Sequence, residues 1–99
     1  MDMNQKKFFR AIQEASSFLK YLSHPLRLKI LCLLSQKSLT VMELQDMSGG
    51  SQAQISQFLA KMRSGGLVSF NKDGNFVRYQ IKDLKVKKII LSLEKIFCP

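Results

Sequence analysis

The 99-residue sequence has no long hydrophobic run. No window of roughly 18 apolar residues occurs, which excludes a transmembrane helix. The N-terminal stretch MDMNQKKFFRAIQE also has neither the apolar stretch nor the small-residue cleavage site of a signal peptide. From the sequence we therefore expect a soluble, cytoplasmic protein.

Histidine is the scarcest residue that could serve a metal or catalytic site. The one histidine, His24, precedes Pro25, and a zinc site needs three or four N, S or O ligands, so we expect His24 to be a helix cap or a surface residue. The sequence offers no acid pair with a plausible base, and its GGS and SGG stretches are too short for a phosphate-binding loop. We expect no enzyme, and hence no catalytic residue, metal ligand or cofactor.

Acidic side chains are few. Seven Asp and Glu stand against sixteen Lys and Arg, which gives a formal net charge of +9. Residues 51–99 hold nine basic and three acidic side chains, whereas residues 1–50 hold seven and four. This balance points to a polyanionic partner and favours nucleic acid, although small basic domains also bind membranes or acidic proteins.

Apolar periodicity predicts two helices in the first third of the chain. Apolar residues at spacings of three and four indicate an amphipathic helix over residues 7–22. Pro25 suits the first turn of a second helix, over about residues 25–36. That segment is apolar nearly all round, so we expect it to be the buried central helix.

Two capping-box patterns then indicate a helix-turn-helix. TVME at 40–43 opens a short helix to about Met47, and SQAQ at 51–54 opens another that runs to about Ser64. A tight glycine turn separates them, as in a helix-turn-helix. We expect Gly66 to form a left-handed cap after the second helix.

The remaining segments predict a hairpin and a last helix. LVSF and FVRYQI alternate apolar and polar residues around an NKDGN turn, which is typical of a β-hairpin. Residues 83–98 place apolar residues on one face of a terminal helix. The expected fold is mainly α (α+β): residues 1–99 form a single winged helix-turn-helix domain with four helices, a hairpin and a fifth helix.

This arrangement predicts which residues contact DNA. The second helix of the motif enters the major groove, glutamine suits adenine, and serine, lysine and arginine hold phosphates. The candidates on that helix are Ser51, Gln52, Gln54, Ser56, Gln57, Lys61 and Arg63, and those on the hairpin are Lys72, Asn75 and Arg78. Two alternatives stay open: any solvated helix face carries Gln and Ser, and the hairpin could be a structural flap.

The motifs HPLRLKIL, SQAQISQFL and GGLV…G…VRYQI resemble those of the ArsR/SmtB winged helix-turn-helix regulators, over about residues 18–82. This resemblance implies a homodimer joined through the first and last helices. It also implies binding to a double-stranded, imperfectly palindromic operator, with release by an inducer and no membrane partner. Phe58 departs from the family, which usually has histidine there, and it can simply pack.

The metal sites of this family are missing. Where the arsenic and cadmium/lead type reads ELCVCEL, this chain reads SLTVMEL, so Thr40 and Met42 replace the two cysteines. The zinc and nickel type needs several histidines and carboxylates on the last helix. We therefore expect no metal site of the family's kinds.

Two cysteines remain, Cys32 and Cys98. From composition alone they read as small buried hydrophobes. Their positions, in KILCLL and KIFCP, resemble those of the paired cysteines in the sulfide- and redox-responsive HlyU/BigR/SqrR branch. That resemblance implies a redox-sensing pair, bridged as a disulfide or polysulfide, with reactive sulfur or an oxidant as inducer.

Two other functions remain open at this point. The protein could bind DNA with inert cysteines and another or no inducer. It could also be a winged helix used as a protein-interaction module, with only weak and sequence-independent DNA binding.

Overall fold

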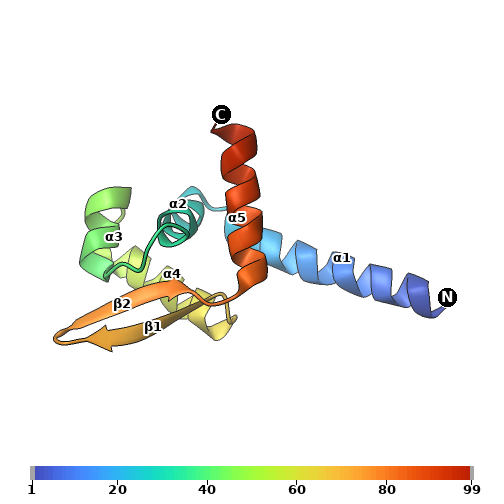
Figure 1. The fold of residues 1–99 in the computed structure, drawn as a ribbon, viewed down its shortest axis with the longest axis horizontal. Coiled ribbons are helices and arrows are strands. Elements are labelled where there is room, and N and C mark those ends of the chain that lie inside the picture. Colours follow the sequence, from blue (N-terminus) through green and yellow to red (C-terminus); the bar gives the residue numbers. More distant parts are fainter. Residues whose placement is uncertain (1, 99) are drawn as a thin grey trace.

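The computed structural model describes residues 2–98, which form five helices and a two-stranded antiparallel hairpin (Figure 1). The predicted order of elements is confirmed. The elements are α1 (Met3–Leu22), α2 (Pro25–Leu34), α3 (Val41–Ser48), α4 (Gln52–Ser64), β1 (Val68–Asp73), β2 (Phe76–Ile81) and α5 (Leu84–Phe97).

Side-chain caps fix where the first two helices begin. The Asp2 carboxylate accepts from the Gln5 backbone N–H at 2.8 Å, and the Gln5 side chain accepts from the Asp2 N–H at 3.1 Å. The prediction that this helix begins at residue 7 is wrong, because apolar periodicity does not register a polar first turn held by a cap. His24 caps α2, which is one of the two roles expected of it, since its Nδ1 accepts from the Leu26 N–H at 3.2 Å.

The two helices of the helix-turn-helix differ in their caps. At α3 the full capping box is confirmed: Thr40 Oγ1 accepts from Glu43 N at 3.1 Å, and Glu43 Oε1 accepts from Thr40 N at 3.0 Å. At α4 the Ser51 hydroxyl accepts from Gln54 N at 3.2 Å. The reciprocal half predicted there is wrong, because the Gln54 amide oxygen faces the Ser51 hydroxyl, at 3.5 Å, rather than its backbone.

Left-handed glycines end both helices of this motif. Gly49 follows α3 with φ +77°, and Gly66 follows α4 with φ +78°, as predicted. Other residues adopt this backbone region only at a cost. Local sequence, through these glycines, therefore determines both the turn before α4 and the turn that leads into the hairpin.

The hairpin is longer and its turn tighter than predicted. The pair Asp73–Phe76 closes the ladder, so the turn has two residues, with Gly74 at φ +62°. The first three residues of the NKDGN segment belong to β1. Farther from the turn, within β2, Tyr79 exchanges two backbone hydrogen bonds with Leu39, at 3.0 and 2.8 Å, which fixes the hairpin to the segment before α3.

The core lies around α2, which packs against α1, α3, α4, α5 and β2, as expected of the central helix. Ile30 and Leu31 of α2 are fully buried. By contrast α1 has no buried residue, and in Figure 1 its N-terminal half projects from the body. Among the described residues, no helix is long and apolar enough to cross a membrane.

Candidate nucleic-acid interface and cysteine pair

Helix α4 has one buried and one open face. Ile55, Leu59 and Met62 are fully buried, and they anchor the helix against the core. The predicted DNA-contacting residues of this helix are all exposed: Ser51, Gln52, Gln54, Ser56, Gln57, Lys61 and Arg63. Solvent or a ligand can therefore reach each of the seven.

A close approach at the turn fixes the position of α4. A Cβ at Gly50 would lie 2.8 Å from both methyl carbons of Leu26 on α2, which is closer than real Cβ contacts. A side chain at position 50 would therefore displace the end of the Leu26 side chain. The start of α4 is in this way held directly against the central helix.

Two basic side chains near the hairpin are already engaged. Arg63 lies over the ring of Phe70, with its guanidinium carbon 4.1 Å from the centroid. Arg78 is half-buried and forms ion pairs with Glu43 (3.0 Å) and Asp73 (3.2 Å). The pairing of Arg78 with Glu43 could not be predicted from the sequence, because nothing local links positions 43 and 78.

The other two hairpin residues predicted to contact DNA are exposed. Lys72 lies near the end of β1, and Asn75 lies in the turn. The tip of the hairpin therefore presents a cation and an amide to the surroundings.

Phe58 packs, as the sequence allowed. The ring is half-buried against the core. Its centroid lies 4.8 Å from that of His24 and 5.1 Å from the guanidinium carbon of Arg27. An aromatic ring at this position joins α4 to the beginning of α2.

The two cysteines are free thiols in different environments. Cys32 on α2 is half-buried, whereas Cys98, at the end of α5, is exposed. Burial raises the pKa of the Cys32 thiol, and the negative charges of Glu94 and Cys98 raise it further. Cys98 thus lies near enough to Cys32 to contribute to this rise, although 66 positions separate the two in sequence.

A polar link joins the ends of α2 and α5 beside these thiols. The Ser35 hydroxyl donates to the Cys32 carbonyl oxygen at 2.6 Å and lies 3.3 Å from Glu94 Oε1. The Glu94 carbonyl in turn accepts from the Cys98 N–H at 2.8 Å. Glu94 therefore contacts the surroundings of both cysteines.

Within residues 2–98, no three His, Cys, Asp or Glu side chains gather in a metal-binding cluster.

Comparison with known proteins agrees with this architecture. Residues 24–69 match the family described as bacterial regulatory protein, arsR family. The chain is 40% identical over 88 residues to the HTH-type transcriptional regulator YgaV of Escherichia coli K12, an alignment that covers 88% of this chain and 89% of YgaV. The chain belongs to the ArsR family. It is a DNA-binding transcriptional regulator with a winged helix fold.

Solved structures of ArsR-family regulators overlay most of the chain. Reduced HlyU from Vibrio cholerae N16961 matches with a TM-score of 0.88 and 33% identity, over 95% of this chain and 99% of HlyU. The transcriptional repressor BigR from Xylella fastidiosa matches with a TM-score of 0.86 and 30% identity, over 98% and 99%. The resemblance to the HlyU and BigR branch is therefore confirmed.

Proposed function

We propose that this ArsR-family regulator is a homodimeric repressor whose operator affinity falls when Cys32 and Cys98 become linked. The observation that carries this proposal is the packing of α2 on α5 beside the two cysteines, where Ser35 Oγ lies 3.3 Å from Glu94 Oε1. A conditional bridge suits the reducing cytoplasm, where a permanent disulfide does not persist. The branch resemblance and the known reduced form of HlyU support it.

Exposed apolar faces support the homodimer. On α1 the side chains of Phe8 and Ile12 are 63% and 46% exposed, and on α5 those of Ile96 and Phe97 are 70% and 76% exposed. Large contiguous apolar surfaces are uncommon on monomers. A second copy of the chain, packed through the same two helices, would cover them.

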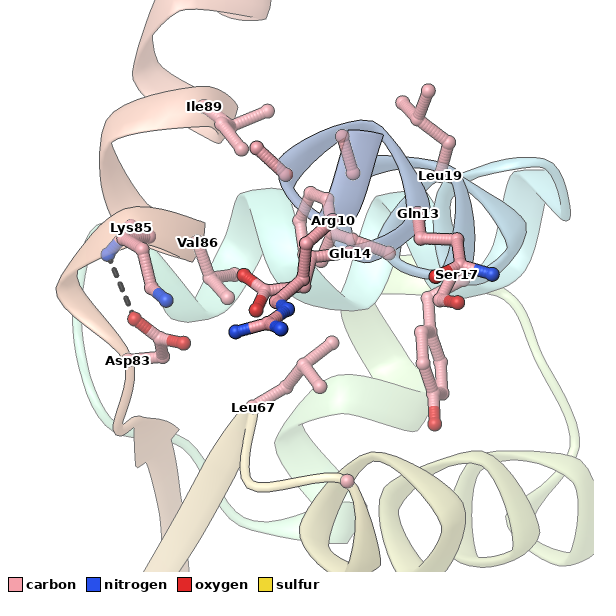
Figure 2. Close-up of a pocket in the computed structure, with 15 residues that line it drawn as sticks. Arg10, Gln13, Glu14, Ser17, Leu19, Leu67, Asp83, Lys85, Val86 and Ile89 are labelled. Atoms are coloured by element: carbon pink, nitrogen blue, oxygen red, sulfur yellow. Dashed lines mark hydrogen bonds between the residues drawn. The ribbon is translucent and has the colours of Figure 1, made fainter. Parts of the chain in front are cut away.

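A cavity between these helices supports the same partner. It measures 810 Å³ and is lined by one side of α1, the turn before β1 and the start of α5. In Figure 2, Leu67, Val86 and Ile89 line it together with Arg10 and Glu14 of α1. A hollow that combines apolar side chains with charged ones such as Arg10 and Glu14 fits an amphipathic helix of the partner subunit.

The DNA contacts follow from the open face of α4. We assign base reading to its glutamines, because glutamine forms bidentate contacts with adenine in the major groove. We assign phosphate contacts to the serines of α4 and to Lys61. Lys72 and Asn75 of the hairpin would contact the DNA backbone next to them. A dimer would present two such helices to two half-sites about 34 Å apart.

The bridging chemistry needs a sulfur donor or an oxidant. A persulfide, RSSH, transfers its outer sulfur to the Cys98 thiolate, which leaves a Cys98 persulfide and releases RS⁻. The Cys32 thiolate then attacks the sulfur bonded to Cys98 Cβ and expels HS⁻, which gives the disulfide. A direct disulfide needs Cα atoms within about 7 Å, and a polysulfide bridge spans a longer gap.

The bridge would act on DNA binding through the position of α5. Cys98 ends the helix assigned to the dimer interface, and Cys32 lies in the helix against which α4 packs. A link between them would shift the dimer interface at α5 relative to the two α4 helices that contact the DNA. Since the half-site spacing is fixed, the bridged protein would bind the operator more weakly.

The test is a titration of DNA with reduced and persulfide-treated protein. The probe is the duplex that the reduced wild type selects from a random-sequence pool, and Cys32→Ser and Cys98→Ser are the matched controls. We expect treatment to weaken binding by the wild type only, with a mass change that identifies the bridge. Unchanged wild-type binding would reject the sensor, and failure to select any duplex would favour an interaction module.

A further inference from the structure

Arg78 forms ion pairs with two carboxylates, Glu43 and Asp73. The sequence has sixteen basic residues, yet within residues 2–98 both ion pairs are made by this one side chain. Its Nη1 lies 3.0 Å from Glu43 Oε1, and its Nε lies 3.2 Å from Asp73 Oδ2. Arg78 is on the hairpin, and Glu43 is in the first turn of α3, so the guanidinium spans from the wing to the helix-turn-helix.

The carboxylate that receives Arg78 is itself fixed. Glu43 Oε1 accepts from the Thr40 N–H at 3.0 Å as part of the α3 cap. Hydrogen bonds from Thr40 together with the charge of Arg78 lower the pKa of Glu43 below its ordinary value. Glu43 is therefore an anion at a defined place at the start of α3, and it gives the guanidinium a rigid point of attachment.

A second attachment lies next to the first. Leu39 and Tyr79 are joined by two backbone hydrogen bonds, at 3.0 and 2.8 Å. The base of the hairpin is also held, because Val68 is buried and Arg63 of α4 lies over the ring of Phe70. The Arg78–Glu43 contact, one residue along β2 toward the turn, adds a side-chain link from the hairpin to α3.

We propose that Arg78 is a positioning residue that fixes the angle of the wing against α3, rather than a contact to a DNA phosphate. Two carboxylates surround its single positive charge, so the group as a whole carries no surplus charge for a phosphate. Lys72 and Asn75, which are exposed at the tip, remain as the groups that meet the DNA.

The proposal differs from a purely stabilising role. Arg78 and Glu43 side chains are 35% and 41% exposed, and ion pairs so accessible to water contribute little to folding stability. Their loss would leave the thermal unfolding midpoint nearly unchanged. Their loss would instead change how the hairpin fits the duplex when α4 lies in the major groove.

The decisive variant is Glu43→Gln. Glutamine at this position keeps the capping box of α3 but removes the charge that holds Arg78. If Arg78 positions the wing, the variant binds the selected duplex several-fold more weakly. If Arg78 is a phosphate contact, its release makes the variant bind more tightly, so the two roles give opposite signs.

Asp73→Asn is the matched control. It removes the other carboxylate partner of Arg78 and one negative charge, but it does not touch the link to α3. We expect Asp73→Asn to bind the selected duplex at least as tightly as the wild type. Both variants are also compared on a scrambled duplex. On that duplex, the loss of either negative charge should change the affinity by the same amount.

The salt dependence provides a second measurement. Each phosphate contact contributes about 0.9 to the slope of log affinity against log salt. We expect Arg78→Gln to weaken binding while the slope stays at the wild-type value. The double variant Glu43→Gln/Arg78→Gln should bind no worse than Arg78→Gln alone, because both changes break the same contact.

The proposal rests on operator binding, which the wild-type arm tests alone. A wild type that selects no duplex would reject the proposed function and this inference with it. If the wild type selects a duplex, the inference alone is overturned when Glu43→Gln binds as tightly as Asp73→Asn, or when Arg78→Gln lowers the salt slope by about one contact.

Discussion

Ser35, which follows α2, and Glu94, on α5, face each other with 3.3 Å between the hydroxyl and carboxylate oxygens. The same hydroxyl donates to the Cys32 carbonyl oxygen. The contact joins the two elements that carry the cysteines, and Glu94 adds its negative charge beside the Cys32 thiol. The reactivity of Cys32 is thus coupled to how α5 lies on α2.

Replacing Glu94 by glutamine should make Cys32 more reactive at neutral pH. The pKa of Cys32 is raised by burial first and by Glu94 second, so its thiolate forms only at higher pH. Removing the carboxylate charge lowers that pKa and moves the alkylation profile of Cys32 to lower pH, while burial keeps it above the ordinary value. The measurement is the rate of iodoacetamide labelling against pH, in a Cys98→Ser background.

The control for this experiment is Asp46→Asn. Asp46 is exposed on α3, so the variant makes the same charge change away from the thiols. It should leave the profile in place. If Glu94→Gln and Asp46→Asn give the same curve as the parent, Glu94 does not act on Cys32.

Polar substitutions on α1 should separate the subunits. Phe8→Ser combined with Ile12→Ser removes two exposed apolar side chains from the surface assigned to the partner. We expect sedimentation velocity to show a shift toward the monomer, and operator binding to weaken because one half-site alone is held. Asn4→Ser, also exposed on α1, should leave the dimer intact. A wild-type protein that sediments as a monomer would contradict the proposed assembly.

Two single substitutions should divide base reading from phosphate binding. Gln57→Ala should lower the preference for the selected duplex over its single-base variants, by about 1–3 kcal/mol at one base pair. Lys72→Ala should weaken binding to all sequences alike and reduce the salt slope by about 0.9. The measurement is fluorescence anisotropy over a series of duplexes and salt concentrations. Equal effects of Gln57→Ala on every duplex would remove that glutamine from base reading.

Local signals were enough to predict most of the fold. Thr40 and Ser51 start α3 and α4, Gly66 follows α4 with a left-handed backbone, and the hairpin strands alternate, because each of these depends on residues a few positions apart. The errors are also local. The start of α1 was misplaced because its polar first turn is held by Asp2 rather than by apolar packing.

The exposed face of α4 was predictable for the same reason, since helical spacing alone separates Ile55 from Gln57. The contacts that organise the site were not. Glu43 and Arg78 are 35 positions apart, and Ser35 and Glu94 are 59 apart. A sequence shows these charges and hydroxyls but not which of them meet, because their meeting depends on how α2, α3, α5 and the hairpin pack.

The projecting part of α1 has a consequence for the folding equilibrium. Residues 2–17 are all exposed in the single protomer, and isolated helices of about 12–15 residues are marginal in water. In the proposed dimer the ordering of this segment is coupled to association, so the unfolding midpoint rises with protein concentration. The number of copies in a cell then governs how much folded regulator exists, as well as how much of the operator it occupies.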